Sequence, residues 1–331
     1  MDFKENHKKL LLQNAPFDFQ AAALELFQYQ AQHNAVYQSY IKHLGVEAAQ
    51  VQALAQIPFL PIEFFKEQEV KAGDFEPEVV FYSSGTTGQV RSRHFVADLS
   101  FYHAVAERTF EQFYGPLQEY VVLALLPSYL EQGGSSLVAM VAHFIKQTGQ
   151  QEEGFYHRDH AGMLQAMRQA RQRGKKVLLI GVSYALLDLA KELNGQEDFS
   201  GVTVMETGGM KGRRREMIRE ELHAHLKKGF GVGAIHSEYG MTELLSQGYS
   251  QGEGVFRPGY SLRVLLRDLN DPFDIGPGHR SGGINVIDLA NIDSCAFIET
   301  KDIGRMQDDG TFEVLGRFDN SDIRGCNLLL I

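Results

Sequence analysis

The pattern of hydrophobic and polar positions along the chain predicts helices and strands that alternate with one another. Residues 18–43 carry apolar side chains at helical spacing between the capping residue Asp18 and the stop at Gly45, which predicts one long helix, and residues 46–56 predict a shorter one. Further along, strands are predicted over 78–82, 120–126, 177–180 and 202–205. Helices are predicted over 98–114, 135–147, 160–173, 183–193 and 213–228. This alternation predicts an α/β fold with a largely parallel sheet.

The pattern changes near residue 254. The later apolar runs are short and are separated by Gly, Pro, Asn and Asp residues, which favour turns. They predict strands over 261–267, 283–289, 295–299 and 311–315. We therefore expect an α/β core over 1–253 and a β-rich C-terminal subdomain over 254–331 that ends in a tail bearing Cys326, the two packing as one body.

Composition narrows the class of protein. The 331 residues hold 32 basic and 42 acidic side chains, a net charge of −10, with 44% hydrophobic and 22% charged residues. These fractions are ordinary for a globular protein, and the acidic excess argues against binding of nucleic acid or anionic membranes. No signal sequence is recognisable, and no apolar run approaches the roughly 20 residues of a membrane helix. A soluble cytoplasmic protein without a membrane span is expected.

A loop rich in serine, glycine and threonine follows the predicted strand at 78–82. Its glycines allow close approach of a ligand, and its N–H and hydroxyl groups can donate to phosphate oxygens. It lacks the Gly-Lys-Ser/Thr ending of a Walker A loop, and by composition alone it could be an ordinary turn. The candidate phosphate-binding residues are Ser83, Ser84, Gly85, Thr86, Thr87 and Gly88.

Three later motifs give this loop a context. They are Glu-Thr-Gly-Gly at 206–209, Tyr-Gly-Met-Thr-Glu at 239–243, and Lys-Asp-Ile-Gly-Arg at 301–305 leading to Leu-Gly-Arg-Phe-Asp-Asn at 315–320. Each is weak alone, but their order resembles the motif series of the adenylate-forming superfamily, which includes acyl-CoA synthetases, luciferases and adenylation domains of peptide synthetases. The resemblance implies the N-terminal core of that fold, of parallel α/β layers plus a small β subdomain.

Within that superfamily, the segments 57–66, 126–137 and 322–326 resemble the LuxE-type acyl-protein synthetases. The resemblance implies that ATP and Mg²⁺ activate a fatty or other carboxylic acid as acyl-adenylate. The acyl group would then pass to an enzyme cysteine and on to a partner, such as an acyl-CoA reductase-like protein or an acyl carrier.

The resemblance also assigns roles to single residues. Ser83 to Gly88 would hold the ATP phosphates, Glu243 would hold Mg²⁺, and Asp302 would accept hydrogen bonds from the ribose. Tyr239 would stack on the adenine. The remaining ATP-binding assignments are Gly208 and Gly209 near the adenine, Gly240, Thr242 at the phosphate or acyl-adenylate end, and Arg317 at the ribose or phosphate.

The sequence departs from the superfamily pattern in two places. Arg91 stands near the position of the usual loop lysine, and a planar guanidinium is not equivalent to an ammonium. The chain also ends where a mobile lid domain with a catalytic lysine would be expected. Arg91, Glu243 and Cys326 are therefore the predicted catalytic residues, with Cys326 as the acyl acceptor. Cys295, in an apolar run, is expected to be a core residue.

The acyl pocket is the least specific prediction, because apolar and aromatic stripes usually belong to the core. Its candidates are Ser128, Tyr129, Leu137 and His236. Two other functions stay open: a carboxylate–CoA ligase that resembles phenylacetate-CoA ligases and forms no covalent intermediate, and a non-catalytic nucleotide-binding module.

Overall fold

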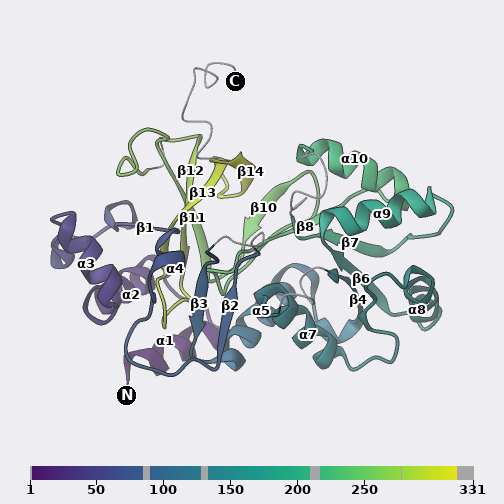
Figure 1. Cartoon of the computed structure of the whole chain (residues 1–331), viewed down its shortest axis with the longest axis horizontal. Helices are drawn as coiled ribbons and strands as arrows, with labels where there is room; N and C mark the ends of the chain where they lie inside the picture. Colours follow the sequence, from purple (N-terminus) through teal and green to yellow (C-terminus); the bar gives the residue numbers. More distant parts are fainter. Residues whose placement is uncertain (1, 85–89, 128–132, 209–216, 277, 319–331) are drawn as a thin grey trace.

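The structure is a computed structural model of the whole chain, and it describes residues 2–84, 90–127, 133–208, 217–276 and 278–318. Two lobes lie side by side (Figure 1). Parallel strands and their helices form one lobe, and antiparallel strands with the N-terminal helices form the other. A two-stranded hairpin lies between them. Among the described residues, no helix is long and apolar enough to cross a membrane.

The first lobe contains the predicted parallel sheet. Its strand order is β5-β4-β6-β7-β8, and all neighbours in it are parallel. The strands are β4 (Tyr120–Leu125), β5 (Gly154–Phe155), β6 (Lys176–Gly181), β7 (Val202–Glu206) and β8 (His236–Tyr239). The helices are α5 (Leu99–Tyr114), α7 (Ser136–Thr148), α8 (His160–Gln172), α9 (Ser183–Leu193) and α10 (Arg219–Phe230). The α/β prediction is confirmed, and Asp98 and Ser135 cap their helices through hydrogen bonds from Phe101 and Val138.

The second lobe continues the same sheet in the order β8-β9-β10-β14-β13-β12-β11. The added strands are β9 (Gly248–Ser250), β10 (Val255–Pro258), β11 (Leu262–Arg267), β12 (Ser281–Asp288), β13 (Phe297–Met306) and β14 (Phe312–Arg317), with β1 (Leu60–Pro61) parallel to β13. The four strands predicted beyond residue 254 are all present. The division at residue 254 itself stays a prediction.

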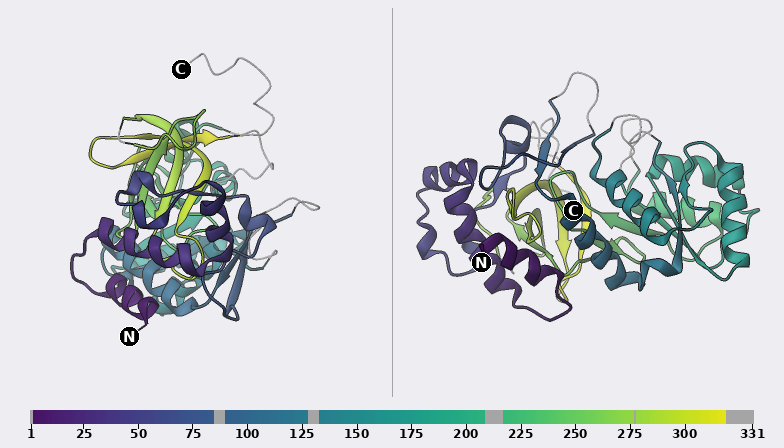
Figure 2. Two further views of the ribbon diagram at one scale, coloured as in Figure 1. Left: turned by 90° about the vertical axis from the view of Figure 1, so that its left-hand side faces the viewer. Right: turned by 90° about the horizontal axis from the view of Figure 1, so that it is seen from below.

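The N-terminal helices α1 (Phe3–Leu12), α2 (Phe19–His33) and α3 (Ala35–His43) pack against this second lobe (Figure 2). The prediction of one helix over 18–43 is wrong, because Asn34 adopts extended backbone angles between α2 and α3. Its Oδ1 accepts from Tyr37 N, and its Nδ2 donates to Ser294 O at 3.0 Å, so a distant loop holds the break. Instead of a helix over 46–56, two short 3₁₀ turns form, η1 (Ala48–Gln50) and η2 (Leu54–Gln56).

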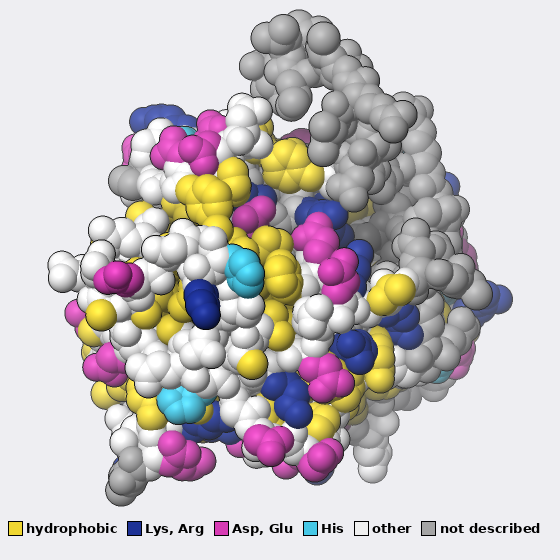
Figure 3. All heavy atoms as spheres, turned by 60° about the vertical axis from the view of Figure 1, so that its left-hand side comes forward, with side chains coloured by type: hydrophobic (Ala, Val, Ile, Leu, Met, Phe, Trp, Pro, Cys, Tyr) yellow, Lys and Arg dark blue, Asp and Glu magenta, His cyan; other side chains and the backbone are white. Residues whose placement is uncertain are grey.

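The hairpin of β2 (Val79–Tyr82) and β3 (Arg93–Val96) joins both lobes. Tyr82 N donates to Gly134 O, next to the parallel sheet, and β3 packs against the short helix α4 (Phe64–Glu67) of the second lobe. On the face of the second lobe shown in Figure 3, acidic and basic side chains are interspersed among polar and apolar ones. Through these contacts, the hairpin brings Ser83 and Ser92, at the base of the loop between β2 and β3, to the junction of the lobes.

Candidate functional site

Three neighbouring parallel strands end at the same edge of the sheet. Gly181 of β6 pairs with Glu206 of β7, and Glu206 pairs with Ser237 of β8, so their carboxyl ends lie in line. In open α/β sheets, ligands bind outside the carboxyl ends of the strands. The candidate site is built around this edge.

Gly208 lies just beyond the end of β7. Its φ of +74° is in the left-handed region, and its backbone N donates to Glu206 Oε2 at 2.6 Å. A Cβ at Gly208 would meet no described atom within 4 Å, so the described residues leave one side of this turn open to a ligand. The second predicted glycine, Gly209, lies outside the described residues.

Three residues predicted at positions 239, 302 and 317 lie together. Tyr239 Oη donates to Asp302 Oδ2 at 3.0 Å, and Arg317 Nε is 3.0 Å from Asp302 Oδ1. Asp302 and Arg317 are direct partners in the β13–β14 pair, and Tyr239 reaches them from the end of β8. Burial raises the pKa of Asp302, and the positive charge of Arg317 partly offsets this. The cluster joins the two lobes at the site.

The ring of Tyr239 is largely enclosed. It packs edge-on against Phe256 and Phe312, with centroid distances of 5.9 and 5.3 Å. Its predicted role as the stacking surface for adenine stays a prediction, as do the predicted roles of Gly240, which is exposed, and Thr242, which is half-buried.

The base of the serine, glycine and threonine loop is a closed hairpin end. Ser83 N donates to Ser92 O, and Ser92 N donates to Ser83 Oγ at 2.9 Å. Arg91 Nε donates to Ser83 O at 2.5 Å, and its guanidinium lies over the ring of Tyr82. Arg91 thus braces the base of the loop. Ser84 is exposed beside it, and Gly85, Thr86, Thr87 and Gly88 lie outside the described residues.

The segment after Gly240 is fixed by side chains from both lobes. His94 Nδ1 donates to Thr242 O at 2.8 Å, and Asn291 Nδ2 donates to Glu243 O at 2.7 Å. Asp288 Oδ2 accepts from the backbone N of Leu245 and of Ser246, at 2.7 and 3.0 Å. Burial lowers the pKa of His94 to about 4, so its imidazole is neutral at pH 7. We call His94, Asp288 and Asn291 the backbone clamp.

Glu243 lies between this clamp and the hairpin. Its side chain is buried, and the Ser92 hydroxyl hydrogen-bonds to the carboxylate. Burial raises the pKa of Glu243, while the Ser92 hydrogen bond and the charge of Arg317 act in the opposite direction. The structure therefore places Glu243 next to the base of the predicted phosphate loop, although the two are about 150 residues apart in sequence.

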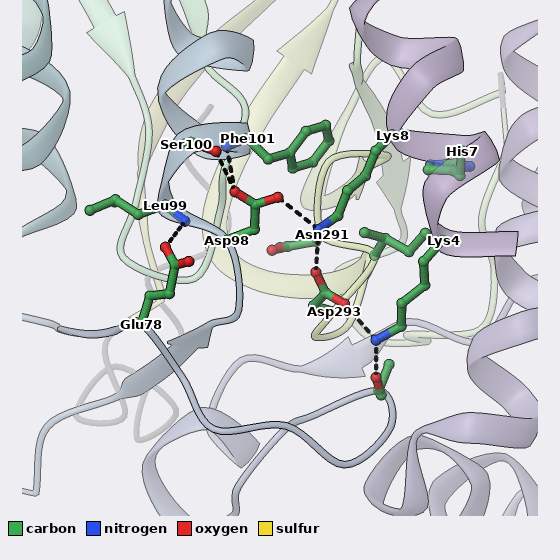
Figure 4. A network of polar contacts seen from close by, with 12 residues as sticks. Lys4, His7, Lys8, Glu78, Asp98, Leu99, Ser100, Phe101, Asn291 and Asp293 are labelled. Atoms are coloured by element: carbon green, nitrogen blue, oxygen red, sulfur yellow. Dashed lines mark hydrogen bonds and ion pairs between the residues drawn. The ribbon is translucent and has the colours of Figure 1, made fainter. Parts of the chain in front are cut away.

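A polar network anchors the loop that carries Asn291. Figure 4 shows Lys8 of α1 between Asp98, at the start of α5, and Asp293, with Nζ–Oδ2 distances of 3.1 and 3.2 Å. Lys4 Nζ also contacts Asp293 Oδ1, at 2.5 Å. Gln30 donates to Asn291 O and accepts from Ala296 N. These contacts supply hydrogen-bond partners to backbone groups of a buried loop that would otherwise have none.

Two carboxylates next to the predicted motif residues were not predicted as site residues. Glu206, fully buried, accepts from Ser183 Oγ and lies 3.6 Å from His223 Nε2 and 3.8 Å from Arg219 Nε. Burial acts to raise its pKa, but the His223 hydrogen bond and the Arg219 charge hold the pKa of Glu206 below its usual value. Burial and the charge of Glu206 raise the pKa of Glu238 to about 8. Glu206 begins the Glu-Thr-Gly-Gly motif, and Glu238 directly precedes the Tyr-Gly motif, so these motifs were the sequence signal that could have pointed to both carboxylates.

The other predicted residues lie apart or outside the description. His236 Nδ1 contacts Tyr114 Oη at 3.2 Å, and Leu137 is half-buried near the start of α7; their pocket roles stay predictions. Cys295 is fully buried, as expected for a core residue, and burial raises its pKa to about 12. Ser128, Tyr129 and Cys326 lie outside the described residues. Within the described ranges, no three His, Cys, Asp or Glu side chains are arranged to hold a metal ion.

The chain was compared with known proteins by sequence and by structure. No family model matches the sequence, and no curated protein is significantly similar to it. Solved structures do match. 2-Hydroxyisobutyryl-CoA ligase, in complex with its acyl-adenylate and CoA, aligns over 97% of this chain and 70% of its own, with a TM-score of 0.64 and 15% identity. ATP-bound MatB from Rhodopseudomonas palustris aligns over 74% of this chain and 49% of its own, with a TM-score of 0.52 and 16% identity.

A third match is O-succinylbenzoate coenzyme A synthetase from Bacillus subtilis in complex with AMP, with a TM-score of 0.50, 16% identity, and coverage of 85% of this chain and 54% of that enzyme. The chain thus spans about half the length of MatB and of this synthetase. It has the mixed α/β fold of the N-terminal core of adenylate-forming enzymes. The predicted fold class is confirmed, and the resemblance to adenylate-forming enzymes holds at the level of structure.

Proposed function

We propose that this protein activates a carboxylic acid as its acyl-adenylate, with ATP as the second substrate. The observation that carries the proposal is the Tyr239–Asp302–Arg317 cluster at the carboxyl ends of parallel strands. It lies in a fold shared with MatB and 2-hydroxyisobutyryl-CoA ligase, whose structures hold ATP and an acyl-adenylate.

The residues present fit a nucleotide. Asp302 Oδ2 accepts a hydrogen bond from Tyr239, Oδ1 forms an ion pair with Arg317, and each carboxylate oxygen can accept a further hydrogen bond. Asp302 can therefore bind ribose hydroxyls while Tyr239 and Arg317 hold it in place. Gly208 leaves space on its open side for a flat ring, and the hairpin base at Ser83 carries the loop proposed to bind phosphate.

Glu243 can supply one carboxylate ligand to the proposed magnesium site. Mg²⁺ in nucleotide sites is commonly held by one or two carboxylates plus phosphate oxygens and water, so three protein ligands are not required. Glu243 offers one carboxylate beside the loop base. When bound there, the ion would neutralise phosphate charge, and the clamp would keep Glu243 in a fixed position. Arg91 at the loop base is the proposed additional positive charge.

In the first step, a carboxylate oxygen of the substrate forms a bond to the α-phosphorus of ATP. The bond from that phosphorus to the bridging oxygen breaks, and pyrophosphate leaves. In the proposed second step, the Cys326 thiolate attacks the acyl carbon, the bond from this carbon to the phosphate oxygen breaks, and AMP leaves. The acyl group would then move to an acyl-CoA reductase-like or carrier partner. Fatty acids are the substrates that the LuxE resemblance proposes.

Acid-dependent exchange of labelled pyrophosphate into ATP tests the first step. We expect exchange with at least one class of acid, and Glu243→Gln should lower its rate by about 100-fold. Glu25→Gln, at an exposed position of α2, is the matched control and should leave the rate unchanged. Urea unfolding of each variant separates catalysis from folding. No exchange with any acid, together with retained ATP binding, would favour the non-catalytic module.

The acyl acceptor requires a separate experiment. After incubation with ATP, Mg²⁺ and the activated acid, intact mass spectrometry should show one acyl adduct that hydroxylamine removes. Cys326→Ser should abolish the adduct, and Cys295→Ser, at the buried cysteine, should retain it. Release of acyl-CoA at an undiminished rate by Cys326→Ser would favour the carboxylate–CoA ligase instead.

A further inference from the structure

One face of strands β8 and β9 is covered by helix α5. Glu238 is the direct partner of Tyr249 in the antiparallel β8–β9 pair, so their side chains lie on the same face. Tyr114 of α5 contacts this face twice, through His236 Nδ1 at 3.2 Å and by an edge-on packing against Tyr249 at 5.5 Å. This face of β8 and β9, which packs against α5, therefore carries both aromatic and polar side chains.

Several polar atoms on this face have no partner. Tyr249 is 1% exposed and Gln247 3% exposed, and neither Tyr249 Oη nor Gln247 Oε1 forms a hydrogen bond. Glu238 makes no hydrogen bond or ion pair with any other described residue. More than nine in ten buried polar groups in proteins do have partners, so the two buried unpaired atoms beside the partly exposed Glu238 carboxylate favour a ligand at this place.

The group lies at the edge of the candidate site. Glu238 directly precedes Tyr239, whose hydroxyl binds Asp302, and Glu238 is itself partly exposed. A Cβ at Gly240 would collide with Glu238 Oε1 and would also approach Gln247. The carboxylate therefore bends over the exposed Gly240, and a molecule bound at the strand ends can reach it.

Among the described residues, no cation lies beside Glu238. The acidic group that acts on it is Glu206, whose own contacts with Arg219 and His223 lie on the α10 side. The other described titratable groups that act on Glu238 or share its face are the hydroxyls of Tyr102 and Tyr249 and the imidazole of His236. Burial and the charge of Glu206 raise the pKa of Glu238, which agrees with a carboxyl group that has no cation among the described residues.

We propose that Glu238, Gln247 and Tyr249 form a recess beneath α5 that binds the far end of the substrate acid, and that this end carries a protonated amine. The ammonium donates to Glu238 and to Gln247 Oε1, and Tyr249 Oη supplies a further acceptor. An alkyl chain would leave all three groups unpaired, and sites built around hydrogen bonds reject substrates that lack the bonding group. The inference rests on the proposed function, because it names the class of acid to be activated.

The test compares carboxylic acids of the same length that differ only in whether they carry an amine, a hydroxyl or an alkyl group. The panel contains α-, β-, γ- and ω-amino acids, their hydroxy analogues and the corresponding alkyl acids, assayed by pyrophosphate exchange. We expect one amino acid to exceed its alkyl analogue by at least about 100-fold in kcat/KM. In Glu238→Gln, which keeps the size of the side chain and removes its charge, this ratio should fall below about tenfold. Glu25→Gln should keep the wild-type ratio.

Equilibrium binding separates this proposal from the proposed function. Calorimetric titration of the same amino and alkyl acids needs no adenylation, and it should show the same preference in the wild type and its loss in Glu238→Gln. If binding discriminates but no acid supports exchange, the recess stands and the proposed function fails. If alkyl acids are bound and activated as well as amino acids, or if Glu238→Gln keeps the preference, the proposal is overturned.

Discussion

Two successive segments, residues 236–240 and 242–246, differ in how their polar groups are bonded. In the second segment, the backbone clamp of His94, Asp288 and Asn291 occupies the carbonyls of Thr242 and Glu243 and two of the following N–H groups. In the first, Glu238 has no partner among the described residues, and the strand paired with it carries the hydroxyl of Tyr249, which is unpaired in the same part of the chain. Both segments lie at the same edge of the sheet.

The contrast separates two uses of buried polar groups. Groups that are hydrogen-bonded to other parts of the protein hold a backbone in one conformation, and their loss is costly. Groups that lack a partner destabilise the empty protein and are retained where a ligand supplies the missing bonds. On this basis, the clamp positions Glu243, and the recess at Glu238 binds substrate. The four predictions below test this division.

The largest effect is expected from Asp288→Ala. Asp288 accepts from the backbone N of Leu245, Ser246 and Ala290 and from the Ser246 hydroxyl, and all these donors are buried. Leaving them unpaired should lower the free energy of unfolding by about 3–5 kcal/mol, measured by urea denaturation at pH 7. Asp309→Ala, which removes an exposed turn carboxylate bonded to Thr311, should lower the free energy of unfolding far less. Equal losses in the two variants would contradict a special role of the clamp.

Asn291→Ala should have a smaller and more local effect. It removes the hydrogen bond from Nδ2 to Glu243 O and should cost about 2 kcal/mol. The distinguishing measurement is amide hydrogen exchange, which should accelerate at Leu245 and Ser246 more than in β4 at the centre of the sheet. Asn6→Ala, on the exposed side of α1, serves as the control. Uniform acceleration across the protein would mean that Asn291 supports the fold as a whole and not the Glu243 segment.

Much of the parallel lobe was predictable from sequence, because its strands are continuous apolar runs and its helices carry local caps at Asp98 and Ser135. The break at Asn34 was not predictable. Its cause is a hydrogen bond to Ser294, 260 residues away. The same holds for the buried loop at 289–296, which looks like a polar turn in sequence and is satisfied by Gln30 and by His7.

For the site, the motifs name residues but not their bonding. Tyr239, Asp302 and Arg317, which come from different motifs, are in contact in the structure, and their roles stay predictions. Glu206 and Glu238 stand in or beside the same motifs, yet only the packing of α10 explains why one carboxylate is paired with His223 and Arg219 while the other is not. Pairing depends on contacts between distant segments, and a single sequence does not record those.

Glu238→Gln should stabilise the empty protein at alkaline pH. The pKa of Glu238 is raised to about 8 in the folded state from 4.5. The unfolded chain therefore loses this proton first, and wild-type stability falls as the pH rises from about 4.5 to 8. Because Glu238 is partly solvated, we expect Glu238→Gln to be more stable than the wild type by about 1–2 kcal/mol at pH 8, with the difference vanishing near pH 4.5. Urea unfolding at several pH values checks this, and a constant difference across that range would contradict the proposed titration.

The smallest effect provides the sharpest comparison between bonded and unbonded groups. Tyr239 and Tyr249 are both buried tyrosines on adjacent strands, but only Tyr239 Oη has a partner, Asp302 at 3.0 Å. Tyr239→Phe should cost about 1–2 kcal/mol, because it removes a hydrogen bond to a carboxylate, whereas Tyr249→Phe should be neutral or stabilising by less than about 1 kcal/mol. If the recess binds the amine of the substrate, Tyr249→Phe should nevertheless weaken binding of the preferred amino acid several-fold in calorimetry, with no change for its alkyl analogue. An unpaired hydroxyl in a substrate recess should be dispensable for folding and needed for binding. If Tyr249→Phe is instead destabilised as much as Tyr239→Phe, the Tyr249 hydroxyl is a structural contact.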